Sequence, residues 1–259
     1  MNIVKDTKQY YLNPSAGTQK NGSFYSDVNF YLNGIIKDDP NILYNTISII
    51  HAEIPYSFYI INEYNNKLVL STVTINIPYG NYNANSLIKY INTQTPTNMT
   101  LSFDSTTGKM KITYNQFFSV LSTSTIQEVL GFDYNKTYTS SGNVIQFPYP
   151  LNCLGTKNLF IKSNVLLQNY NSVTQDYVTL SSIPVNVEPY SIILYNNYAN
   201  SNFIIKNKVL DNLEIQIYDD NNNLVDFNNV EWNITIEITS YISANFNNTN
   251  LNQYLAQLN

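Results

Sequence analysis

The sequence predicts a mostly β fold, a single jelly-roll antiparallel β-sandwich with an inserted small α/β subdomain. Three observations predict it. Apolar and polar residues alternate with period two in many short segments, as in strands that bury one face. About eight such segments lie outside one block of the chain, and eight antiparallel strands joined by loops indicate a sandwich or jelly roll. Inside that block, near residues 58–135, helix signals interrupt the alternation.

The clearest alternation lies in three segments. In the first, the apolar residues Val28, Phe30 and Leu32 alternate with the more polar residues between them. The second and third, residues 213–217 and 232–238, also alternate apolar with polar residues, and they lie on either side of the polar run 219–223. We therefore expect these last two segments to form an antiparallel hairpin with a long loop. The other expected strands are 45–54, 158–166, 177–183, 190–195 and 202–206.

The interrupting block reads as a β-α-β-β-α subdomain. An expected strand at 67–77 ends at Pro78. Asn83 is expected to start a helix, whose apolar stripe has i, i+3, i+4 and i+7 spacing: Ala84, Leu87, Ile88 and Ile91. Segments 99–103 and 110–114 face each other across a turn that ends in Gly108. Residues 124–127 read as a capping box that opens a short helix ending at Gly131.

These patterns predict four parts along the chain. Residues 1–20 have little strand pattern and are expected to be an N-terminal arm. Residues 21–57 and 136–245 form a discontinuous jelly-roll domain, and residues 58–135 form the inserted α/β subdomain. Residues 246–259 are expected to be a C-terminal tail.

The composition excludes several functions. The chain has 43 Asn and 23 Tyr, no Arg, 12% charged residues and a net charge of -5. Specific nucleic-acid binding usually needs clustered Lys and Arg, so we expect none. One Cys rules out an internal disulfide, and a zinc site would have only Cys153, His51 and carboxylates to draw on. The apolar stretches are too short for a membrane span.

Candidate catalytic groups are few. His51 lies in an expected strand with Glu53 two residues on, a pair suited to proton transfer. The favoured interpretation is a hydrogen-bonded histidine at a sheet edge or subunit contact. Cys153 follows two prolines in an expected loop without a second Cys, which favours a structural role. We therefore expect no catalytic, metal or cofactor site residues, no cofactor and no enzymatic activity.

The loop 219–226 is rich in oxygen ligands of the kind that calcium prefers, so it is compared with the EF-hand pattern. Positions one, three and five of an EF-hand loop are matched by Asp219, Asn221 and Asn223. Leu224 then stands where glycine is required, and Val230 stands where the bidentate Glu belongs. A polar hairpin loop is therefore favoured, and a looser ion site stays open.

A series of short phrases begins in the segment 45–66. In chain order they are Ile54-Pro55-Tyr56-Ser57-Phe58-Tyr59-Ile60-Ile61, Ile77-Pro78-Tyr79-Gly80-Asn81-Tyr82, Phe103-Asp104 with Thr107-Gly108-Lys109, Leu130-Gly131-Phe132, Ile183-Pro184-Val185 and the segment 218–232. By these phrases the sequence resembles a known family, the penton (minor capsid) proteins of virophages and polinton-like viruses. The collinear match covers roughly residues 21–240.

The resemblance implies a single jelly roll without catalytic activity. It implies a homopentamer at the icosahedral fivefold vertices, beside capsomers of a major capsid protein. It also implies a virion location after assembly in the host-cell cytoplasm. Low charge and abundant tyrosine suit a protein covered by neighbours.

Two other functions stay open from the residues alone. A carbohydrate- or receptor-binding β-sandwich on a virion surface would present exposed aromatics, and its partner would be a host-surface glycan. A glycoside-cleaving enzyme would place two carboxyl groups within about 10 Å in a groove.

Overall fold

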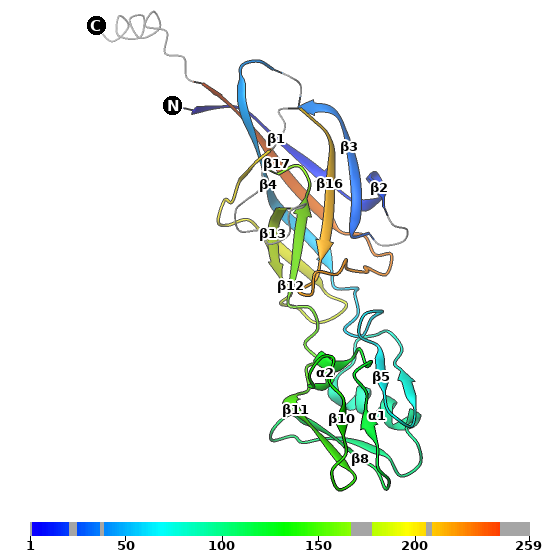
Figure 1. The fold of residues 1–259 in the computed structure, drawn as a ribbon. Helices are drawn as coiled ribbons and strands as arrows, with labels where there is room; N and C mark the ends of the chain where they lie inside the picture. Colours follow the sequence, from blue (N-terminus) through cyan, green and yellow to red (C-terminus); the bar gives the residue numbers. More distant parts are fainter. Residues whose placement is uncertain (1, 21–24, 37–38, 167–177, 206–208, 244–259) are drawn as a thin grey trace, which may run out of the picture. The chain divides into compact units, whose positions relative to one another are not determined.

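The computed structural model describes residues 2–20, 25–36, 39–166, 178–205 and 209–243. The chain divides into two compact units (Figure 1). The sandwich unit comprises Met1–Ser57 and Lys157–Asn259, and the inserted unit comprises Phe58–Thr156. No helix in the described ranges is long and apolar enough to cross a membrane.

The sandwich unit is built from two antiparallel sheets. The first sheet has the order β1-β17-β4-β14, and β15 also pairs with β4. The second sheet has the order β13-β12-β16-β3-β2. Their bounds are β1 Asn2–Leu12, β2 Thr18–Gln19, β3 Asp27–Ile36, β4 Ile42–Pro55, β12 Asn158–Ser163, β13 Val178–Pro184, β14 Ile192–Asn196, β15 Phe203–Ile204, β16 Leu210–Tyr218 and β17 Asn233–Ser243. A 3-10 turn, Pro14–Ala16, joins β1 to β2.

The strand order is that of a jelly roll. Without the two-residue strands β2 and β15, the sandwich unit has eight described strands. In chain order, the first sheet holds the first, eighth, third and sixth of them, and the second sheet holds the second, seventh, fourth and fifth. Each sheet therefore mixes strands from both ends of the chain segment, as two interlocked Greek keys require. The predicted jelly-roll β-sandwich is confirmed.

The expected hairpin between residues 213–217 and 232–238 is wrong. β16 pairs with β12 and β3 in the second sheet, whereas β17 pairs with β1 and β4 in the first. Alternation shows which side chains are buried but does not specify the neighbouring strand. The polar run instead closes a local turn, in which the Asp219 N–H donates to the Asn223 carbonyl (2.9 Å).

The N-terminal arm is also corrected. Residues 2–12 form β1, which pairs with β17 from Asn2↔Ser243 to Leu12↔Ile234. β1 is an edge strand, and most of its described side chains are exposed, whereas Leu12 is buried. An exposed edge strand needs no apolar stripe, so its sequence lacks the alternation that marks the central strands. The expected C-terminal tail, 246–259, lies outside the described residues.

The inserted unit is a mixed α/β unit with small sheets ordered β11-β8-β7, β10-β9 and β5-β6. Its elements are β5 Lys67–Val69, β6 Thr74–Asn76, α1 Ala84–Gln94, β7 Thr100–Phe103, β8 Lys109–Thr113, β9 Ser119–Val120, α2 Gln127–Leu130, β10 Tyr138–Thr139 and β11 Val144–Pro150. Its end differs from the expected residue 135. β11 pairs with β8 inside this unit, so the unit extends to Thr156.

Local expectations in the inserted unit had different outcomes. Helix α1 is confirmed. Its start is capped in both directions, because the Asn83 side chain accepts from the Ser86 N–H and the Ser86 side chain accepts from the Asn83 N–H. The single strand 67–77 is wrong: β5 and β6 form a hairpin in which the Leu70 N–H donates to the Val73 carbonyl.

The capping box at 124–127 is also wrong. Ser124 Oγ accepts from the Val69 N–H (2.9 Å), and α2 starts at Gln127 without a side-chain cap. The expected helix end at Gly131 is confirmed, with φ of 84°. Glycine adopts this left-handed conformation without the steric cost that a Cβ brings.

Gly131 and Gly142 offer a matched test of the inserted unit. Both have positive φ, but a Cβ on Gly131 would lie 2.3 Å from the Tyr149 carbonyl oxygen, whereas a Cβ on Gly142 meets nothing within 4 Å. We expect Gly142→Ala to lower the free energy of unfolding by about 1 kcal/mol. Gly131→Ala should lower it by about 3 kcal/mol or more, since backbone must move. Equal losses in chemical denaturation would contradict the Gly131 packing.

Candidate functional site

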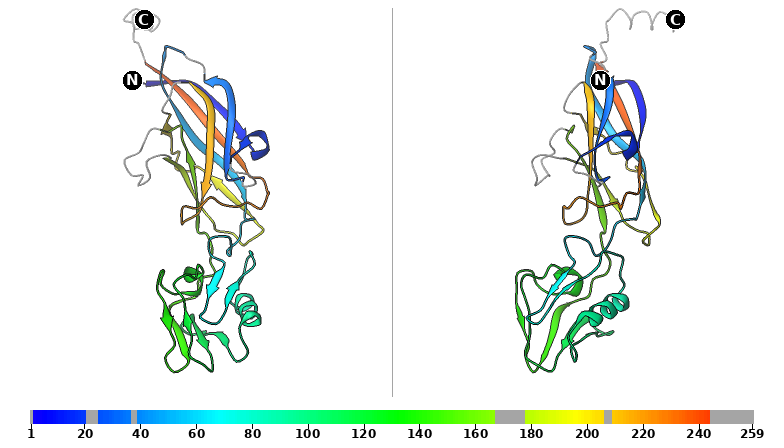
Figure 2. Two further views of the ribbon diagram at one scale, coloured as in Figure 1. Left: turned by 45° about the vertical axis from the view of Figure 1, so that its right-hand side comes forward. Right: turned by 90° about the vertical axis from the view of Figure 1, so that its right-hand side faces the viewer.

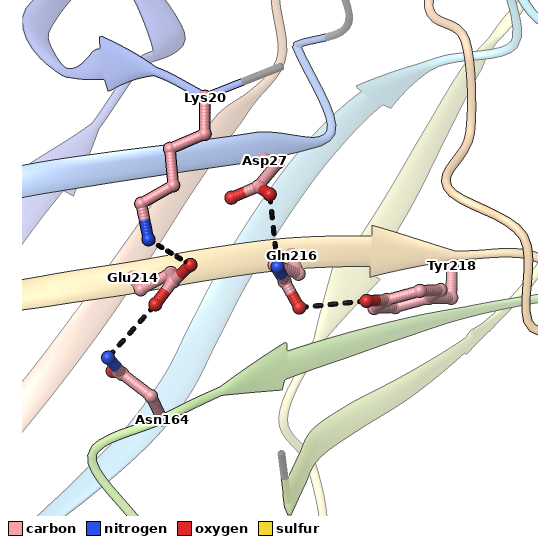
Figure 3. Close-up of polar contacts among 6 residues, drawn as sticks. All are labelled: Lys20, Asp27, Asn164, Glu214, Gln216 and Tyr218. Atoms are coloured by element: carbon pink, nitrogen blue, oxygen red, sulfur yellow. Dashed lines mark hydrogen bonds and ion pairs between the residues drawn. The ribbon is translucent and has the colours of Figure 1, made fainter. Parts of the chain in front are cut away.

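The outer face of the second sheet carries buried polar side chains. On β16 the inward residues are apolar: Leu213, Ile215 and Ile217. The outward residues Glu214 and Gln216 are nevertheless only 4% and 6% exposed, and Asp27 on β3 is 2% exposed. Buried carboxylates are rare unless they are paired. We call the group the buried polar network (Figure 3), and its members are Lys20, Asp27, Asn164, Glu214, Gln216 and Tyr218.

Glu214 ties three segments of the second sheet together. Its Oε1 receives a hydrogen bond and ion pair from Lys20 Nζ, and Lys20 directly follows β2. Its Oε2 accepts from Asn164 Nδ2 (2.9 Å), just after β12. Figure 3 shows both side chains reaching Glu214 from either side of β16. A charge-assisted pair of this kind satisfies a carboxylate that the fold has removed from water.

Gln216 forms the other half of the network. Its Nε2 donates to Asp27 Oδ2 (3.0 Å), and its Oε1 accepts from the Tyr218 hydroxyl (2.9 Å). Lys162 Nζ lies 4.3 Å from the centroid of the Tyr218 ring, a cation–π contact from β12. The network therefore spans β3, β16 and β12 on one face.

The pKa of Asp27 is raised, chiefly by burial. The Gln216 hydrogen bond lowers it, the Glu214 charge raises it, the Lys20 charge lowers it and a hydrogen bond with Glu214 raises it. Asp27 and Glu214 are thus neighbours, and both are almost fully buried. Glycoside hydrolysis instead uses carboxyl groups roughly 5–9.5 Å apart on either side of a sugar. The pair suits a structural contact between strands.

The raised pKa of Asp27 makes stability depend on pH. The folded state holds this proton to higher pH than the unfolded chain. The stabilisation that this proton contributes is complete below the ordinary Asp pKa of 3.8, which applies in the unfolded chain. It is lost as the pH rises through the raised pKa of folded Asp27. Asp27→Asn cannot ionise, and it removes the repulsion between two neighbouring carboxylates. We expect it to flatten this slope and to raise the free energy of unfolding at pH 7 by about 1 kcal/mol.

Asp211→Asn is the control for this experiment, because Asp211 is an exposed aspartate on β16, the strand that pairs with β3. Chemical denaturation of both variants from pH 4 to pH 8 measures the effect. An Asp27→Asn protein that keeps the wild-type slope would show that Asp27 does not titrate as described.

His51 lies on β4 in the first sheet, beside the edge strand β14. Its Nδ1 is 2.9 Å from Asn196 Oδ1, and its Nε2 is 3.4 Å from Glu53 Oε1. The hydrogen bond to Asn196 is the main cause of a raised His51 pKa, which burial opposes and Glu53 assists. The structure thus brings together the expected His51–Glu53 pair. It adds Asn196, which lies 145 residues away in sequence and so gave no local signal.

The other singled-out residues, Cys153 and the polar turn that begins at Asp219, have local structural contacts. Cys153 is half-buried, and burial raises the pKa of its thiol to about 11, so the reactive thiolate is disfavoured. Asp219 Oδ1 accepts from the N–H groups of Asn221 (2.9 Å) and Asn223 (2.8 Å). Asp220 Oδ2 accepts from the Asn158 N–H (3.3 Å) instead, which links this turn to β12. Within the described ranges, no three His, Cys, Asp or Glu side chains gather as a metal site.

On the inserted unit, three side chains donate hydrogen bonds to one carboxylate, that of Asp133. No pattern in the sequence predicted this cluster. Asp133 Oδ2 accepts from Tyr138 (2.5 Å) and Lys136 (3.0 Å), and Oδ1 accepts from Tyr149 (2.9 Å). These bonds, Tyr138 first, lower the pKa of Asp133 to about 2. The cluster fixes the hydroxyl of Tyr149, whose side chain remains 53% exposed.

Several exposed large apolar side chains of the sandwich unit lie together at one edge of the first sheet. This β14 group comprises Tyr190, Ile192, Leu194, Tyr198 and Ile204, on or beside β14 and β15. Val4 and Tyr11 on β1 and Tyr31 on β3 are also exposed, but they lie on different faces. Isolated exposed apolar residues are normal, but grouped ones mark interaction surfaces.

Comparisons with known proteins found a similarity among solved structures. No protein-family model matches the chain, and no curated protein gives a significant match. Among solved structures, the crystal structure of selenomethionine-labelled mavirus penton protein is 12% identical to this chain. The match covers 91% of this chain and 100% of that one, with a TM-score of 0.47.

Proposed function

We propose that the chain is a structural capsid protein, a penton that forms homopentamers at icosahedral fivefold vertices beside major capsid capsomers. The jelly-roll strand order of the sandwich unit is the observation that carries the proposal, because viral capsid domains use this architecture. Lectin domains use it too, so the fold alone does not decide between them. The surface and the sequence phrases supply the remaining support.

The surface is suited to contacts with neighbouring proteins. Tyr11, Tyr190 and Tyr198 are 80%, 79% and 88% exposed. Tyrosine is enriched at protein interfaces, whereas Lys and Glu are depleted there. A shell subunit must bury several sides against neighbours, and a weakly charged surface lowers the desolvation cost of doing so.

The phrase Ile54-Pro55-Tyr56-Ser57 lies where the chain leaves the sandwich unit. The Tyr56 N–H donates to the Ser191 carbonyl (2.9 Å), and Ser57 Oγ donates to the Phe227 carbonyl (2.7 Å). The Asn228 side chain donates back to the Ser57 carbonyl (2.6 Å). A motif of the resembled family thus anchors the exit to the inserted unit.

Coexpression with a major capsid protein tests the proposed vertex role. We expect the chain to copurify with assembled particles and to appear as fivefold density at their vertices in electron microscopy. The same preparation without the chain is the control and should lack that density. Particles whose vertices are identical in both preparations would contradict the penton assignment.

The inserted unit favours one second candidate, binding of a host-surface glycan. Tyr134 and Tyr149 are 61% and 53% exposed, and Glu128 and Asp133 accept from their hydroxyl groups. Rings fixed in this way present apolar faces of the kind that sugar rings contact.

Glycan binding predicts that the double replacement Tyr134→Ala with Tyr149→Ala weakens binding about tenfold or more, about 1.4 kcal/mol. Tyr79→Ala removes another exposed tyrosine of the same unit and should leave binding unchanged. Binding to a glycan array and its titration measure both. Failure of the wild-type chain to bind any glycan would remove this candidate.

A further inference from the structure

Within the buried polar network, an amine, a carboxylate and a side-chain amide meet on the outer face of the second sheet. They belong to Lys20, Glu214 and Asn164. The segments that carry Lys20 and Asn164 follow β2 and β12, which lie on opposite sides of the β16–β3 pair (Figure 2). β12 pairs with β16 up to Lys162↔Gln216, so Asn164, two residues on, comes beside Glu214.

One carboxylate contacts both side-chain nitrogen atoms. Glu214 Oε1 accepts from Lys20 Nζ, and Glu214 Oε2 accepts from Asn164 Nδ2 (2.9 Å). The Glu214 side chain is only 5% exposed, whereas the Lys20 side chain is 46% exposed and Asn164 also reaches solvent. A buried carboxylate thus holds an amine and an amide together, and a small product has a route to solvent.

We propose that Glu214 catalyses an isopeptide bond between Lys20 Nζ and Asn164 Cγ. Glu214 takes a proton from the lysine ammonium, because only the neutral amine is a nucleophile. The amine attacks Asn164 Cγ and the Nζ–Cγ bond forms. Glu214 returns its proton to Nδ2, the Cγ–Nδ2 bond breaks and ammonia departs. The second proton that Nζ loses leaves with the ammonia as ammonium, and no oxidant or other reactant is required.

The carboxylate is placed for both proton transfers, because it already bonds to the attacking nitrogen and to the leaving nitrogen. The reaction occurs once in each chain and does not rest on the proposed capsid function. The bond would close a loop from residue 20 to residue 164, and this loop contains the whole inserted unit. Closing a long loop restricts the unfolded chain and therefore stabilises the folded one.

Two other lysines show what the proposed reaction requires. Lys162 Nζ donates to Asn222 Oδ1 (2.5 Å), so this amine contacts the amide oxygen itself rather than a carboxylate shared with the amide. Lys136 contacts the carboxylate of Asp133, which also accepts from two tyrosine hydroxyls, and a hydroxyl is not an acyl group that an amine can attack. We expect neither of these lysines to become linked.

The intact mass of the purified chain, after incubation at neutral pH, tests the proposal. We expect the wild-type mass to be lower than the sequence mass by one molecule of ammonia. Since a linked Lys20 is not cleaved by trypsin, digestion should give one branched peptide that joins residues 9–37 to residues 163–206. Lys20→Arg keeps the positive charge beside Glu214 without the lysine amine, and Glu214→Gln cannot take the proton. Both variants should keep the full sequence mass.

Lys162→Arg is the matched control and should lose ammonia as the wild type does. The control matters because an asparagine also loses ammonia when it closes a ring on its own backbone. A loss of ammonia that persists in Lys20→Arg would therefore overturn the proposal, and so would a folded wild-type chain of full sequence mass. The branched peptide of the wild type decides the result even if Glu214→Gln does not fold.

Discussion

Burial of Trp232 fixes the point at which the chain passes from one sheet of the sandwich to the other. Trp232 immediately precedes β17 of the first sheet, yet its Nε1 donates to the Tyr25 carbonyl (2.7 Å), just before β3 of the second. Its ring meets Phe30 of β3 edge-on, at 6.2 Å between centroids, and it is fully buried. This contact holds the start of β17 against the second sheet, so β16 and β17 diverge. The jelly-roll order depends on that divergence.

Sequence patterns predicted which side chains enter the core but not which strands become neighbours. The alternation of Ile215 and Ile236 with polar residues gave the buried faces of β16 and β17 correctly. Both strands are flanked by sequence-distant partners, and no local signal encodes that choice. Helix α1 was predictable because its cap and stripe are local. The end of the inserted unit was not, because it depends on the pairing of β11 with β8.

The candidate sites show the same division between local and distant information. His51 and Glu53 are two residues apart, so their contact could be foreseen. The buried polar network could not, because Glu214 and Gln216 occupy the polar positions of an alternating strand and read as solvent-facing. Lys20 and Asn164 bond to Glu214, Asp27 bonds to Gln216, and all three partners come from distant segments. The outer face of the second sheet is thus closed by its own side chains, whereas the β14 edge of the first sheet remains open to a partner.

The mass of the species that the purified chain forms in solution tests most directly whether this weakly charged jelly roll assembles with copies of itself. Native mass spectrometry of the folded protein is expected to show a species with five times the 29.7 kDa mass of one chain. Class averages from electron microscopy should then show a fivefold ring. A folded protein that gives only the single-chain mass over the whole accessible concentration range would contradict the account.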